Sequence, residues 1–409
     1  MKKEGRPQAI CRIVAGLVLV ISLPGCGVDW GYIFAAAVGQ IEILRKSVPI
    51  SQATGSTALT SEQRSKLGLI RDARVYADEI IGLNVEDNYT LFYDSGGEPV
   101  AFNVSACRKD AFEPRLWTFP IVGAVPYLGF FDRKAADAKY NELAAEQLDV
   151  FMYEIDAYSG LGYFPSVVLS PMLERSEISL AETVFHELLH STIWRPNDVT
   201  FNESLATFVG RTAAIEYLAD RYPEQTELVQ YAIEEFEDVD RFSDFILTFF
   251  NELDSFYSSD LPSEAKIAGR EALYRASRDR FAAEIQPLMN HPDRYEWGRD
   301  LPTNNAWLLG IRRYNLDLVV FQDVFTATGK DWPASLQLFR AAAGERDPYT
   351  YLRTWLAAPH ATSPAHLKKG EGTRDRQTVF LGQPRSPRGA CPSRSATTLV
   401  GVESGAIRE

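Results

Sequence analysis

The sequence is poor in cysteine and histidine. Its 409 residues include 4 Cys and 5 His. With so few cysteines, a Cys-ligated zinc site is not supported. Cys11 and Cys26 lie in an N-terminal leader, which leaves Cys107 and Cys391 as a pair that could bond in an oxidising compartment. We expect no structural disulfide between them, because Cys391 falls in a tail of doubtful structure.

Long apolar segments are also scarce. Residues 13–23 are apolar but too short to span a bilayer comfortably. Basic residues precede this stretch, as in a secretion signal (Lys2, Lys3, Arg6 and Arg12). It ends in Leu23-Pro24-Gly25-Cys26, which resembles a bacterial lipobox, although Pro24 is unusual at its position. We therefore predict a lipoprotein signal peptide over residues 1–25 and a lipid on Cys26, with an ordinary signal peptide cut nearby as the alternative.

Positive charge is in deficit. The formal net charge is −13, and removal of residues 1–25, with four basic residues and one acidic residue, makes it −16. An acidic chain argues against nucleic acid or an anionic lipid surface as a partner. A lipid on Cys26 would then supply the membrane attachment. Gly27 rather than Asp follows the cysteine, which resembles lipoproteins of the outer membrane, so we expect the bacterial envelope with the protein facing the periplasm.

The end of the chain changes in composition. Residues 361–409 are rich in Pro, Gly, Ser and basic residues and poor in large apolar ones, which predicts a disordered tail. Residues 26–360 form a body long enough for a large core, as one domain or as two lobes around a cleft.

The most informative segment is His186-Glu187-Leu188-Leu189-His190. On an α-helix, residues four apart share one face, so both imidazoles can reach one metal ion. The apolar spacing over 179–194 predicts that helix. Glu187 lies beside the same face, where a carboxylate can take a proton from a water activated by zinc.

A third ligand is offered by the segment that follows. A catalytic zinc keeps one position open, so three protein ligands are expected. Glu203 is the best candidate, in the first turn of a helix over 203–222 for which Asn202 is a plausible N-cap. A site with three histidines would need His291, about a hundred residues away. Glu182, one turn before His186, is expected to be a solvated helix residue, with support of His186 as the alternative.

The remaining pattern predicts an α+β fold that is mostly helical. A small mixed sheet with helices precedes the motif helix, and a helical lobe follows it, as in a zincin-like metallopeptidase. The predicted strands are 89–93, 100–104, 116–122 and 150–155. The predicted helices are 29–50, 61–83, 134–148, 224–256, 263–288, 305–328 and 334–343.

The chain resembles a bacterial family of predicted zinc aminopeptidases, often lipoproteins, that is grouped with the gluzincin peptidases. The matching segments are Gly31-Tyr32 to Gly39-Gln40, Trp117 to Pro120, Val125 to Phe131, Ala157 to Phe164, His186 to His190, Phe201 to Ala206 and Asn304 to Ala306. The resemblance implies His186, His190 and Glu203 as zinc ligands and Glu187 as catalytic base. The Gly-x-Met-Glu-Asn segment with which better-known gluzincin aminopeptidases grip the free amine is missing, so a metallopeptidase is better supported than an aminopeptidase.

Three tyrosines, Tyr158, Tyr163 and Tyr314, are candidates for stabilising the oxyanion. Tyr158 lies beside a glycine-containing segment, and Tyr314 lies on a helix that Asn304 could cap; packing is the alternative for each. The sequence thus predicts a peptidase with one catalytic Zn²⁺, a peptide as its substrate and no organic cofactor. A non-catalytic envelope lipoprotein, acting as a scaffold with a structural or vestigial metal site, is the alternative.

Overall fold

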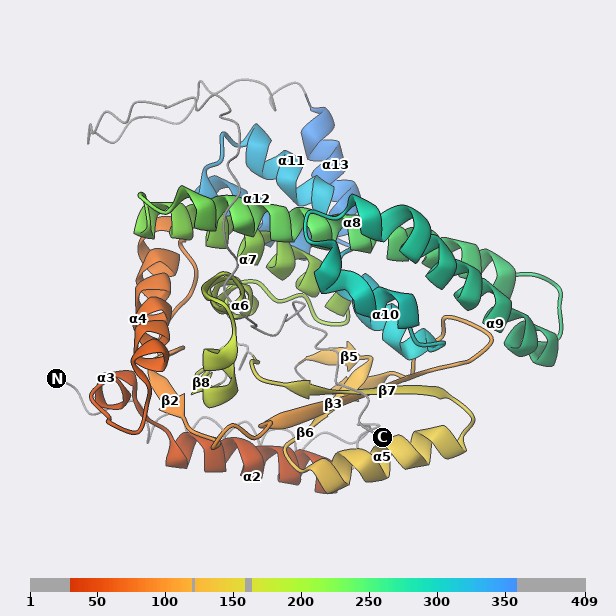
Figure 1. Cartoon of the computed structure of the whole chain (residues 1–409), viewed down its shortest axis with the longest axis horizontal. Helices are drawn as coiled ribbons and strands as arrows, with labels where there is room; N and C mark the ends of the chain where they lie inside the picture. Colours follow the sequence, from red (N-terminus) through yellow and green to blue (C-terminus); the bar gives the residue numbers. More distant parts are fainter. Residues whose placement is uncertain (1–29, 120–121, 159–163, 359–409) are drawn as a thin grey trace.

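The computed structural model describes residues 30–119, 122–158 and 164–358, a mostly helical α+β fold with small sheets (Figure 1). The predicted signal peptide, Cys26, Cys391 and the tail over 361–409 lie outside the described residues. Within the described part, none of the helices combines the length and apolar character needed to cross a membrane. Cys107 is a free, buried thiol.

Helices form the N-terminal region. They are α2 (Trp30–Lys46), α3 (Ile50–Ala53) and α4 (Ser61–Tyr76), which continues as the π-helical turn η1 (Ala77–Ile81). A capping box starts α4, in which Thr60 accepts from the Gln63 backbone and Gln63 accepts from the Thr60 backbone. The helix expected over 61–83 is confirmed, whereas the one expected over 29–50 ends at Lys46, before the strand β1 (Val48–Pro49).

The strands form three small sheets. An antiparallel sheet has the order β6 (Tyr127–Phe130), β3 (Ala101–Cys107), β7 (Asp149–Ile155). A second sheet joins β1 (Val48–Pro49) antiparallel to β2 (Leu91–Tyr93), and β2 parallel to β8 (Val168–Leu169). The hairpin β4 (Trp117–Phe119) and β5 (Gly123–Val125) is the third. Only the second sheet is mixed, so the expectation of one mixed sheet was wrong: the alternation in a sequence predicts strands but not their partners.

Strand β3 is buried along its whole length because both faces of its sheet are covered. The helix α5 (Arg133–Ala145) packs on one face and α10 (Asn305–Tyr314) on the other (Figure 1). Asn304 caps α10, as expected, by accepting from the Trp307 backbone. The sheet thereby holds α10 in place over the centre of the molecule.

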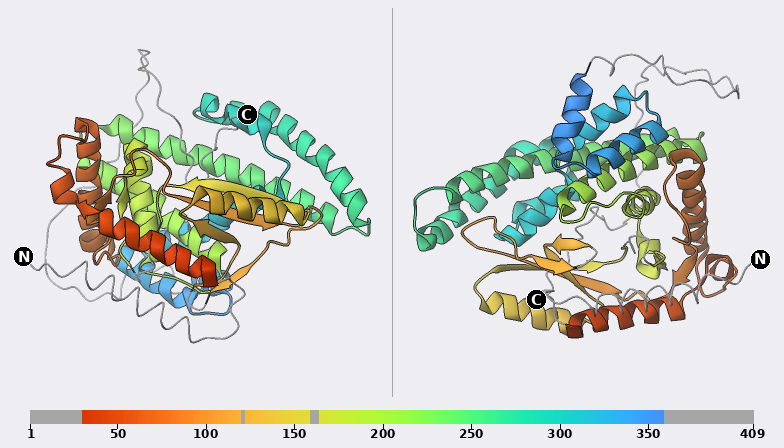
Figure 2. Two further views of the ribbon diagram at one scale, coloured as in Figure 1. Left: turned by 90° about the horizontal axis from the view of Figure 1, so that it is seen from below. Right: turned by 180° about the vertical axis from the view of Figure 1, so that it is seen from behind.

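The motif helix α6 (Glu177–His190) runs through the interior, between α4, α7 (Val199–Arg221) and the sheets (Figures 1 and 2). Ser176 caps it by accepting from the Ser179 backbone. All its residues are buried except Glu177 and Glu187. A helix that is buried nearly all round is held by packing, so its side chains have fixed directions.

The C-terminal lobe is helical, as predicted. It contains α8 (Thr226–Tyr257), α9 (Ser263–Arg280) with its extensions η3 (Phe281–Ile285) and η4 (Gln286–Leu288), then η5 (Pro292–Asp300), α10, α11 (Leu318–Ala327), α12 (Trp332–Ala343) and α13 (Pro348–Ala357). The single helix expected over 305–328 was wrong. The chain turns between α10 and α11, where Asp317 has a φ of 55° in the left-handed region, which ends helical geometry.

Candidate metal centre

Two histidines one turn apart on α6 face a common point. The Nε2 atoms of His186 and His190 lie 3.2 Å apart, and the two rings meet edge to face. Each residue is 6% exposed. The predicted helical placement of the pair is confirmed.

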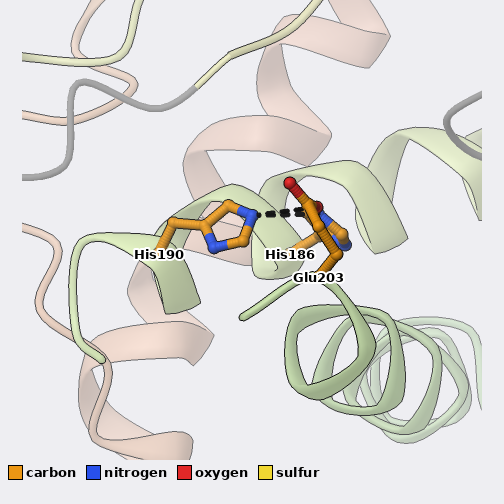
Figure 3. Close-up of side chains that lie close together, drawn as sticks. All are labelled: His186, His190 and Glu203. Atoms are coloured by element: carbon orange, nitrogen blue, oxygen red, sulfur yellow. Dashed lines mark hydrogen bonds and ion pairs between the residues drawn. The ribbon is translucent and has the colours of Figure 1, made fainter. Parts of the chain in front are cut away.

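The third member of the cluster comes from α7. Glu203 Oε2 lies 3.2 Å from His186 Nε2 and 3.3 Å from His190 Nε2. Figure 3 shows the three side chains turned toward one another. Within the part of the chain that the structure describes, this is the only group of three His, Cys, Asp or Glu side chains close enough to share a metal ion.

These spacings fit a tetrahedral ion. Ligand atoms at about 2.0–2.1 Å from a tetrahedral zinc lie about 3.3–3.4 Å from one another, and the three separations here are 3.2, 3.2 and 3.3 Å. Two imidazoles and a carboxylate are also a donor set that zinc accepts. Three buried polar groups whose donor atoms converge in this way fit a bound cation better than an apolar core.

The α6–α7 connection fixes Glu203 opposite the histidines. The Asn202 side chain accepts from the Arg195 backbone N–H and donates to the Arg195 carbonyl, both at 2.8 Å. Asn202 was expected to cap the helix, and this was wrong: Asp198 is the N-cap, accepting from the Phe201 backbone. Glu203 consequently lies in the second turn of α7, because the helix starts four residues earlier than the cap residue suggested.

Helix α7 approaches α6 closely because residue 210 is a glycine. A Cβ at Gly210 would lie 3.0 Å from the carbonyl oxygen of Glu182 and 3.3 Å from His186 Cβ. A larger residue would push the helices apart beside a candidate ligand. This role of Gly210 could not be predicted from the sequence, because nothing in the local pattern shows which residue of α7 faces α6.

The clustered side chains shift one another's pKa values. Burial disfavours the Glu203 carboxylate, but His190 and His186 outweigh burial and hold its pKa below the usual value. Burial likewise disfavours a charged His186, yet Glu203 and Glu187 raise its pKa above the usual value. The two shifts have opposite signs, as expected for groups that attract each other.

Glu187 occupies the position expected of a base. It is the one residue between Ile178 and His190 that is not buried. Partial burial raises the pKa of Glu187 above its usual value, although the nearby His186 and His190 act to lower it. A partly accessible carboxylate next to the ligands can accept a proton from water and return it.

Glu182 differs from expectation. It was expected to be solvated, but it is fully buried and its pKa is raised by that burial. Neither carboxylate oxygen has a hydrogen-bond partner among the described residues, and the same is true of His186 Nδ1. Metal-bound imidazoles usually donate their second N–H to an acceptor. No hydrogen bond joins Glu182 to His186 Nδ1, and Glu182 acts on that imidazole through its charge, which raises the His186 pKa.

Of the candidate tyrosines, Tyr163 lies outside the described residues, and Tyr158 and Tyr314 lie in different surroundings. The Tyr314 ring lies 6.0 Å from the His186 ring, and burial together with Glu203 raises its pKa well above the usual value, so the phenol stays protonated. The Tyr158 hydroxyl donates to Gln40 Oε1 at 2.7 Å, and its ring packs on Phe131. That hydrogen bond ties Tyr158 to α2, whereas Tyr314 adjoins the cluster.

Comparison with known proteins identifies a family for the chain. A family model described as "Putative aminopeptidase" matches residues 31–347, and this match supports a peptidase role. No curated protein and no solved structure matches the chain. The matched residues include the whole of α6, Glu203 and α10. The chain therefore belongs to the putative aminopeptidase family.

Proposed function

We propose that the protein is a zinc-dependent peptidase whose metal is held by His186, His190 and Glu203. The observation that supports it is the triangle of donor atoms 3.2–3.3 Å apart with Glu187 beside it. When bound, zinc would polarise a peptide carbonyl and lower the pKa of a water molecule toward about 7.

The protein's own residues would then move the protons. Glu187 accepts a proton from the attacking water as the oxygen bonds to the carbonyl carbon. It passes this proton to the amide nitrogen as the C–N bond breaks, so the products are a carboxylic acid and an amine. Tyr314, protonated beside His186, donates a hydrogen bond to the oxyanion that forms.

The arrangement of elements supports a zincin-like assignment. A region of small sheets precedes the motif helix, α7 supplies the third ligand, and a helical lobe follows. The family name implies removal of an N-terminal residue. We propose the broader peptidase activity, because no segment gripping a free amine is recognised in the sequence.

We also propose that the protein is anchored in the bacterial outer membrane, facing the periplasm, by a lipid on Cys26. The apolar stretch over 13–23, its basic flank and the Leu23-Pro24-Gly25-Cys26 segment support this proposal. Mass spectrometry of the N-terminal peptide should find acyl chains on Cys26. An unmodified Cys26 in protein purified from membranes would contradict the proposal.

The catalytic proposal is tested on the full-length protein purified in detergent. Metal content and cleavage of a mixed peptide library are measured for the wild type, Glu187→Gln and Glu177→Gln. Glu177 is the matched control, since it is the other residue of α6 that is not buried. We expect one zinc ion in each of the three proteins. The wild type and Glu177→Gln should cleave peptides, and Glu187→Gln should not. Zinc without cleavage by the wild type would favour the scaffold alternative, and absence of zinc would refute the proposed site.

A further inference from the structure

Among the described residues, one buried cation differs from the others in having no ion pair. Four of them form an ion pair with a carboxylate at 2.6–2.8 Å: Lys66 with Glu62, Arg175 with Asp156, Arg211 with Asp240, and Arg270 with Asp149. Arg313 is 5% exposed, as buried as any of them, and has no ion pair with a carboxylate among the described residues. A buried charge that no carboxylate contacts is costly, so a guanidinium in this state can accommodate a further anionic partner.

Aromatic residues surround the Arg313 side chain. Its Cζ lies 5.1 Å from the ring centroid of Tyr127 on β6. The Tyr153 hydroxyl on β7 accepts a hydrogen bond from the guanidinium, and a neutral phenol does not balance its charge. An aromatic face stabilises a guanidinium without occupying its N–H groups, which lie in the plane of the group. Arg313 therefore has further donors, beyond the one that Tyr153 accepts, with which to bind an anion.

Arg313 lies next to the metal centre. Ser204, the neighbour of Glu203 on α7, donates from Oγ to the Arg313 carbonyl at 3.1 Å. The next residue on α10 is Tyr314, whose ring is 6.0 Å from that of His186. The charge of Glu203 also acts on Arg313, Tyr127 and Tyr153. The unpaired cation thus belongs to the surroundings of the proposed site.

We propose that Arg313 binds the α-carboxylate of a short peptide substrate. The inference rests on the proposed peptidase function and narrows its substrate class. Guanidinium and carboxylate form two parallel hydrogen bonds, the strongest pairing that arginine makes in proteins. Because Arg313 and Tyr314 are adjacent on α10 and Tyr314 adjoins His186, a carboxylate bound by Arg313 would belong to a residue close to the scissile bond. The substrates are therefore short peptides with free C-termini.

A role for Arg313 at the oxyanion is the competing one. Tyr314 already supplies a donor beside His186, and a neutral phenol costs less to bury than a charge while no oxyanion is present. A permanently charged guanidinium that no carboxylate contacts instead suits a substrate group that is charged from the moment of binding. The two roles differ in what happens when the substrate's carboxylate is removed.

Binding of alanyl-phenylalanine and of its C-terminal amide is measured by calorimetry on Glu187→Gln protein, which cannot turn either over. We expect the acid to bind at least about tenfold more tightly than the amide, because a charged hydrogen-bonded pair is lost in the amide. Adding Arg313→Gln should abolish the preference. Adding Arg312→Gln should leave it unchanged, since that neighbouring arginine on α10 lies over Phe250, 4.6 Å from the ring centroid.

Hydrolysis of the acid and of the amide is then measured for the wild type and for Arg313→Gln, both of which retain Glu187. The results distinguish the carboxylate site, the oxyanion role and the peptidase function. If the wild type binds and cleaves acid and amide equally well, the carboxylate site is refuted and the peptidase stands. If Arg313→Gln lowers kcat equally for both substrates, Arg313 serves the oxyanion and the proposal is overturned. If nothing is cleaved, the proposed function fails, and the binding comparison still decides the carboxylate site. Should Arg313→Gln unfold, the wild-type ratio and Arg313→Lys, which keeps the charge, provide the test.

Discussion

Loss of one ligand should remove the stabilisation that zinc gives to the folded protein. A ligand that binds only the folded state stabilises it by about 4.1 kcal/mol at a concentration one thousand times its Kd. For a large domain, 1 kcal/mol corresponds to about 2 °C in Tm, so saturating zinc should raise the wild-type Tm by about 8 °C. Glu203 provides one of three donor atoms and the only anionic one. We therefore expect Glu203→Ala to lose most of this shift.

The assay is thermal unfolding of metal-free protein with and without added zinc. Glu187→Gln is the matched control, because it changes a neighbouring carboxylate that the structure does not place among the three ligands. It should keep the full shift. An equal shift in Glu203→Ala and the wild type would refute the reasoning, since zinc would then be binding elsewhere. No shift in either protein would refute the zinc site itself.

Three further predictions concern the framework of the site and the stability of the fold. Asn202→Ala removes both hydrogen bonds to Arg195 and should lower the free energy of unfolding in urea by about 1–3 kcal/mol; a change under about 0.5 kcal/mol would contradict this. Gly210→Ala should weaken zinc binding in a calorimetric titration by forcing α7 from α6, whereas Gly68→Ala, where a Cβ meets nothing within 4 Å, should not; equal affinities would contradict the close approach. Arg108 holds the pKa of Asp110 at about 2, below its ordinary 3.8, so the stability that Asp110 contributes is present above pH 3.8 and lost as pH falls toward 2. The difference in unfolding free energy between the wild type and Asp110→Asn should shrink over that range, and a constant difference would contradict it.

Two of the expectations that failed, those for Asn202 and Glu182, share one cause. Asn202 has the chemistry of an N-cap, but its side chain bonds to Arg195 across the connection between two helices. Glu182 is charged and was expected in water, yet α7 covers it through the close approach at Gly210. In both cases a residue far from the local pattern decided the environment, and helical periodicity carries no information about that residue.

Features that depend only on local spacing along the chain could be predicted from the sequence. The spacing of His186, Glu187 and His190 fixes their relation on one helix, because the geometry of an α-helix does not depend on the rest of the fold. Glu203 could be selected from its chemistry and its distance along the chain. It is packing between distant segments that brings the Glu203 carboxylate to both imidazoles, sets Tyr314 beside His186 and buries Arg313 without an ion pair among the described residues. These relations depend on how α6, α7, α10 and the sheet pack, and packing joins residues that are distant in sequence.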